Sequence, residues 1–120
     1  MYYDDRKETL PEAPVKTPLL GWQRLCLTAA NYMEKRGWTR NSDRDIKGQV
    51  CLRGALRMAR ELGEEGGDYV YSLSDYTRAM ASVADHIGPR AGAGIPYWND
   101  NFCTSKEEAV ALLRKSANSK

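Results

Sequence analysis

Three adjacent residues, Trp98, Asn99 and Asp100, place an aromatic ring, an amide and a carboxylate together near the end of the chain. Such side chains suit a ligand site, because an indole stacks on a ligand ring while the amide and carboxylate form hydrogen bonds to it. Arg90, in the preceding glycine-rich stretch, adds a cation that could hold an anion. They equally suit a loop that Trp98 pins to the body and that Asn99 and Asp100 shape by side-chain turns. We favour the structural interpretation and keep these four residues as a candidate small-molecule or hydrolase site.

The remaining residues offer little for catalysis or metal binding. His86 is the only histidine and lies near the end of a predicted helix, where an imidazole commonly bonds a carbonyl. The cysteines Cys26, Cys51 and Cys103 show no C-x-x-C pairing, and their odd number argues against a disulfide framework. The sequence therefore favours a non-enzymatic protein with no metal site and no cofactor.

Positive charge is concentrated in the middle of the chain. Residues 35–60 contain eight basic side chains and only two acidic ones, although the whole chain carries only +2. Arg53, Arg57 and Arg60 are spaced i, i+4 and i+7, which predicts one stripe on a helix. This stripe is either a solvated face whose arginines pair with Glu61, Glu64 or Glu65, or a surface for nucleic acid or an acidic protein. The candidate binding residues are Arg40, Arg44, Lys47, Arg53, Arg57 and Arg60.

The spacing of apolar residues predicts four main helices. The first carries Trp22, Leu25, Cys26, Ala29, Ala30 and Met33 on one face and stops at Gly37. The second begins at a cap supplied by Asn41, Ser42 or Asp43 and ends at Gly63. Gly48, Gly54 and Ala55 on this helix suggest a close helix–helix approach.

Two further helices are expected after residue 70. Ser72 with Asp75 predicts the start of one that ends at Gly88, and Thr104 with Glu107 forms a capping-box pattern for the last. Residues 88–103 between them are expected to form a long loop. The predicted fold class is all-α, a compact bundle of about four helices with an irregular N-terminal arm.

The bulk composition is that of one ordinary globular domain. The chain has 120 residues, of which 42% are hydrophobic and 28% charged. We expect an arm over residues 1–17, which contains two prolines and is followed by Pro18, and a single helical domain over 18–120. No signal peptide pattern and no apolar run of membrane-spanning length is visible, which favours a cytoplasmic protein without membrane contact.

The motifs also support a resemblance. Gly37-Trp38-Thr39, the segment from Gly48 to Leu56, and Trp98-Asn99-Asp100 occur in this order, followed by a helix with Glu107, Val110 and Leu113. This pattern resembles a small uncharacterised helical family, a domain of unknown function, of actinobacteria and their phages. The resemblance covers about residues 19–117. It implies a helical domain of bacterial or phage origin and assigns no activity or functional residues.

Together these observations favour a small non-enzymatic protein that binds another macromolecule. With the resemblance, the natural role is a bacteriophage accessory factor acting on a host protein. One alternative is a nucleic-acid-binding module that uses the basic stripe, and another is a small-molecule binder or hydrolase at residues 98–100. Whether the apolar faces also form a homodimer stays open.

Overall fold

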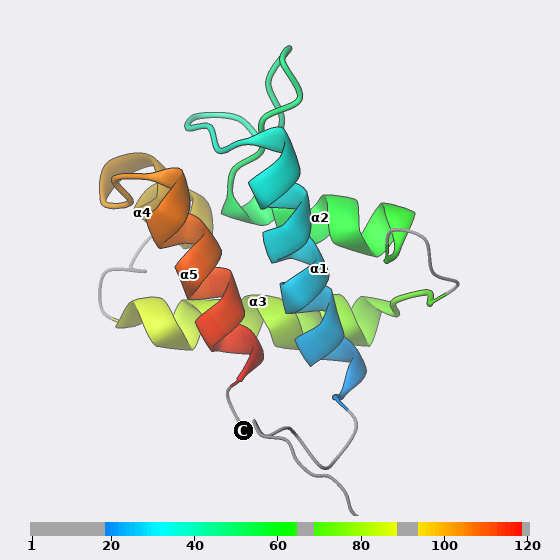
Figure 1. Ribbon diagram of the computed structural model, residues 1–120. Helices are drawn as coiled ribbons and strands as arrows, with labels where there is room; N and C mark the ends of the chain where they lie inside the picture. The colour runs from blue at the N-terminus through cyan, green and yellow to red at the C-terminus, as the bar shows by residue number, and fades with distance from the viewer. Residues whose placement is uncertain (1–18, 65–68, 89–93, 119–120) are drawn as a thin grey trace, which may run out of the picture.

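The computed structural model describes residues 19–64, 69–88 and 94–118, and these form five helices without a strand (Figure 1). The all-α prediction is confirmed, with one helix more than expected. The expected arm, residues 1–17, and Arg90 lie outside the described residues. The helices are α1 (Gly21–Arg36), α2 (Leu52–Leu62), α3 (Leu73–Ile87), α4 (Ile95–Asn101) and α5 (Lys106–Ala117).

Helix α1 is the centre of the bundle. It packs against α2, α3 and α5, and in Figure 1 α5 runs beside it in the opposite direction while α3 crosses behind both. The apolar face read from its sequence is buried throughout, and Leu25, Cys26, Ala29, Ala30 and Met33 have no exposed surface. The helix stops at Gly37, whose φ of 95° is a conformation that glycine adopts without strain.

Two helix starts show how local hydrogen bonds decide the boundary. At α3 the predicted capping box is present, since the Ser72 hydroxyl accepts from the Asp75 amide and the Asp75 carboxylate accepts from the Ser72 amide. At α5 the prediction is wrong by one residue, because Ser105 is the cap and its hydroxyl accepts from the amide of Glu108. Thr104 and Ser105 are each followed three positions later by a glutamate, so the pattern alone fits either residue.

The predicted start of α2 is wrong. The helix is capped by Cys51, whose Sγ accepts from the Gly54 amide at 3.3 Å, and not by any residue of 41–43. Residues 37–51 instead fold back irregularly, because Val50 exchanges backbone hydrogen bonds with Gly37 and Thr39. The close approach expected at Gly54 is real, but its partner is this returning segment and not a second helix.

Helix α4 occupies seven residues, Ile95–Asn101, of the segment 88–103 that was predicted as a loop. Ile95, Trp98 and Asn99 are its buried residues, and their spacing is helical. The apolar pattern misses this helix because one of its three inward positions holds an asparagine. In the part of the chain that the structure describes, no helix is long and apolar enough to cross a membrane.

Candidate functional site

Asn99 has no exposed surface and joins α4 to the 37–51 segment and to α2. Its Oδ1 accepts from the Trp38 indole at 2.8 Å and from the Leu52 amide at 3.1 Å. Its Nδ2 donates to the Thr39 carbonyl at 3.1 Å and to Asp100 at 3.0 Å. Both donors and both acceptor positions of this buried amide are therefore used within the fold.

Asp100 continues the same connection. Its Oδ1 accepts from the Asn41 amide at 2.8 Å, and Asn41 is held with a φ of 68°, which is uncommon for a residue other than glycine. Arg40 donates to the Cys103 carbonyl and lies over the Trp38 ring at 5.3 Å. Asn99 and Asp100 thus anchor the 37–51 segment, and Arg40 adds a further link to Cys103.

Asp43 pairs with two arginines of the predicted stripe. Its carboxylate accepts from Arg53 Nε at 3.0 Å and from Arg57 at 2.7 Å. Partial burial alone would raise the pKa of Asp43, but the hydrogen bond from Arg53 and the charges of Arg53 and Arg57 outweigh it, so the pKa lies below its ordinary value. The expected partners were glutamates later in the chain, and the fold-back of residues 37–51 explains why Asp43 takes their place.

The remaining candidate arginine of the stripe and the remaining candidate basic residues of the 37–51 segment lie at the surface. Arg44, Lys47 and Arg60 are exposed, and within residues 19–64, 69–88 and 94–118 none of them forms an ion pair. The six candidate binding residues therefore divide into Arg40, Arg53 and Arg57, which form contacts inside the fold, and Arg44, Lys47 and Arg60, which form no ion pair among the described residues.

Two cavities lie side by side along the outer face of α2. One, of about 180 Å³, is lined by Asp43, Arg44, Gly54, Arg57, Met58 and Glu61. The other, of about 130 Å³, is lined by Arg57, Arg60, Glu61, Leu73 and Tyr76. Because both are lined by Arg57 and Glu61, they are neighbours on the surface, and we call the pair the α2 trough. It runs from the 37–51 segment across α2 to the start of α3.

Residues 44–50 form a small hairpin that projects beyond the helices (Figure 1), closed by an antiparallel bridge between Arg44 and Val50. The Asp45 carboxylate accepts from the amides of Lys47 and Gln49, and the Gly48 amide donates to the Asp45 carbonyl at 3.0 Å. Gly48 has a φ of 84°, which suits glycine at the end of such a turn. The turn is therefore held by its own backbone and by one carboxylate.

At the tip of this hairpin Ile46 is 99% exposed. Sequence reasoning missed it, although an isoleucine inside the polar stretch Asp45-Ile46-Lys47-Gly48 was the available signal. The turn does not need an apolar residue there, since its hydrogen bonds come from Asp45 and the backbone. Burying an isoleucine side chain is worth about 1.5–3 kcal/mol, and the described fold leaves that contribution unused.

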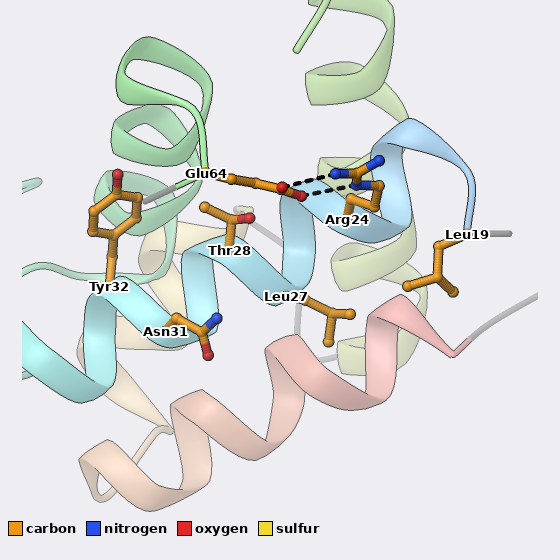
Figure 2. A pocket seen from close by; sticks show the side chains of 7 residues that line it. All are labelled: Leu19, Arg24, Leu27, Thr28, Asn31, Tyr32 and Glu64. Carbon is orange, nitrogen blue, oxygen red and sulfur yellow. Dashed lines mark hydrogen bonds and ion pairs between the residues drawn. The ribbon is translucent and has the colours of Figure 1, made fainter. Parts of the chain in front are cut away.

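A larger cavity of about 410 Å³ opens on α1 (Figure 2). Arg24 and Glu64 close one side of it with a two-pronged ion pair of 2.7 and 2.8 Å, and Leu27 and Asn31 lie on the opposite side. Thr28 shares a hydrogen bond with Tyr71, and Tyr32 donates to the Gly63 carbonyl. Most of its polar groups are thus already paired with one another.

His86 and the three cysteines, the residues considered for catalysis or metal binding, are buried or hydrogen-bonded within the fold. His86 Nδ1 lies 2.9 Å from the Ser82 carbonyl, as its position in the helix predicted. The three cysteines are buried free thiols, and burial raises the pKa of Cys26 to about 12. Among the described residues, no three side chains of the histidine, cysteine, aspartate and glutamate types gather as a metal site.

Fold and site together define a small all-α protein in which residues 98–100 anchor a projecting hairpin. The chain belongs to DUF6197, a family of unknown function, whose model matches residues 23–119. The resemblance seen in the motifs is thereby confirmed to the extent of a domain of unknown function. No curated protein and no solved structure is detectably similar to the chain.

Proposed function

We propose that this protein acts by binding a partner protein, with the 44–50 hairpin as its main contact and Ile46 as the anchor. The single observation that carries the proposal is a 99% exposed isoleucine on a turn that hydrogen bonds already hold in shape. A preformed turn loses little conformational freedom on binding, and a fully exposed aliphatic side chain can enter a pocket without leaving contacts of its own.

The resemblance to a family of actinobacteria and their phages extends this proposal. We take the partner to be a bacterial host protein and the chain to be a bacteriophage accessory factor that works in the host cytoplasm. This role requires no catalytic set, in keeping with a non-enzymatic protein.

The two alternatives lose support from the geometry. Nucleic acid binding through the stripe would need Arg53 and Arg57, whose guanidinium groups pair with Asp43, and Arg40, which bonds Cys103. A small-molecule or hydrolase site at residues 98–100 would need Asn99, whose polar atoms are used inside the fold. Both would require breaking contacts that the binding of a protein at the hairpin leaves intact.

The test is capture of the partner by three tagged full-length proteins from nuclease-treated host lysate, quantified by mass spectrometry. These are the wild type, Ile46→Ser and Val70→Ser. Val70 is the matched control because it is also aliphatic and 81% exposed but lies far along the chain, just before α3. A stoichiometric protein retained by wild type and Val70→Ser and lost by Ile46→Ser is the expected result. Equal capture by all three proteins, or capture that disappears with nuclease, contradicts the proposal.

A further inference from the structure

The α2 trough begins where the hairpin joins the body, since Arg44 belongs to both. A protein that holds Ile46 would therefore reach the trough with a neighbouring segment of its own chain. The chemistry of the trough then says what that segment should contain.

Charge is the first indicator. The trough presents the guanidinium groups of Arg44, Arg57 and Arg60, against the carboxylates of Asp43 and Glu61. Asp43 is already neutralised by Arg53 and Arg57, which leaves Glu61 to oppose Arg44 and Arg60. Within the described ranges these two arginines have no ion-pair partner, and a guanidinium group matches the planar geometry of a carboxylate.

Apolar surface is the second indicator. Met58 contributes to one half of the trough, and Leu73 with the ring of Tyr76 contributes to the other. Leu73 is 61% exposed although it is the first residue of α3. A ligand that fits both properties alternates carboxylates with aliphatic or aromatic side chains, which is possible for a peptide.

We propose that the α2 trough binds an acidic, apolar peptide segment of the partner, with its carboxylates on Arg44 and Arg60 and its apolar side chains against Leu73 and Tyr76. This inference rests on the proposed function, because it names the chemistry of the partner that the hairpin anchors. A nucleic acid fits less well: Glu61 repels phosphates, and a tight phosphate complex commonly uses more cations than Arg44, Lys47 and Arg60 supply.

The experiment selects ligands from a yeast-displayed library of short random peptides with the full-length protein. Selection on wild type is followed by counter-selection on the double variant Arg44→Glu/Arg60→Glu. Synthetic fluorescein-labelled versions of the selected peptides, and a fluorescein-labelled single-stranded oligonucleotide, are then titrated by fluorescence anisotropy. Lys115→Glu is the control for charge reversal, since Lys115 is exposed on α5, away from the trough.

The expected outcome is enrichment of peptides rich in Asp or Glu with interspersed Leu, Ile or Tyr. Arg60→Glu should weaken their binding at least about tenfold, whereas Lys115→Glu should leave it within about twofold. The inference is overturned if the selected peptides are neutral or basic, or if none of them binds wild type more tightly than the double variant. It is also overturned if the oligonucleotide binds more tightly than the peptides. The proposed function fails separately, if Ile46→Ser captures the partner as wild type does.

Discussion

At the scale of single residues, Gly54 has the least room for a side chain among the described glycines. It lies in the first turn of α2 with the backbone of Asp43 laid against it, and a Cβ built there would be 1.8 Å from the Asp43 carbonyl oxygen. A glycine inside a helix ordinarily costs about 1 kcal/mol relative to alanine. Here the close approach explains why a residue with a poor helix propensity occupies the site.

Gly54→Ala should therefore destabilise the protein by at least about 2 kcal/mol, whereas the same substitution at an ordinary helical position would stabilise it. Urea unfolding followed by circular dichroism measures the change. Gly88→Ala is the matched control: among the described residues nothing lies within 4 Å of its added Cβ, so its φ of 69° is what opposes the change, at about 1–2 kcal/mol. A Gly54→Ala protein as stable as wild type would contradict the described contact.

Asn99→Ala should cost about 2–4 kcal/mol, because it leaves the Trp38 indole N–H and the Leu52 amide without their acceptor in a buried place. Asn99→Asp should be no better, since a carboxylate cannot donate to Thr39 or to Asp100. Asn101→Ala, on the exposed side of the same helix, should change the free energy of unfolding by less than about 1 kcal/mol. Similar losses at both positions would argue against a special role for Asn99.

The three thiols should be unreactive in the folded protein. All are buried, and burial raises the pKa of each, so little thiolate forms at neutral pH. Ellman's reagent should label none of them in native buffer on the timescale of minutes and all of them in denaturant. Rapid labelling of one cysteine in native buffer would show that its surroundings open.

At the scale of elements, helix boundaries that local interactions fix were predicted correctly, and boundaries that long-range hydrogen bonds fix were not. Helices α1 and α3 were foreseen because their apolar spacing and end residues act locally, as at Gly37 and Ser72. The start of α2 was not, because Val50 pairs with Gly37 and Thr39, which lie more than ten residues earlier. The anchoring role of residues 98–100 was favoured from the sequence, but their helix and their partners depend on long-range hydrogen bonds that spacing does not encode.

The contact between the 37–51 segment and α2 should depend on pH through Asp43. Its pKa is lowered in the folded protein, so its pairing stabilises the fold above the unfolded pKa of about 3.9 and is lost as pH falls through the lower folded value. Asp43→Asn should accordingly be less stable than wild type at about pH 6, with the difference shrinking toward about pH 3. Urea unfolding at both pH values checks this. A difference that stays constant with pH would contradict the ion-pair contribution.

At the scale of the whole molecule, the helical body and the tip of the projecting hairpin differ in what they bury. The core residues specify the body, whereas Ile46 makes no buried contact in the described structure. Membership in the family of unknown function assigns no role to the body or to the hairpin.

Ile46→Ser should leave the free energy of unfolding within about 0.5 kcal/mol of wild type, because no buried surface is lost. Thermal and urea unfolding measure this, and the same preparation then serves the capture experiment. A large loss of stability would mean that Ile46 belongs to the core and would remove the basis for its anchoring role.

The hydrogen bonds of Asn99 also have a consequence for the order of folding. They reach residues 47, 60 and 61 positions earlier in the chain, so these contacts form only once α4 is in place, whereas the pairing of Val50 with Gly37 and Thr39 spans a much shorter stretch of chain. Closing so long a loop is slow compared with forming α1 or α3. A chain that emerges only as far as α3 would thus carry the 37–51 segment without its hydrogen bonds to α4, and these bonds would be added among the last steps of folding.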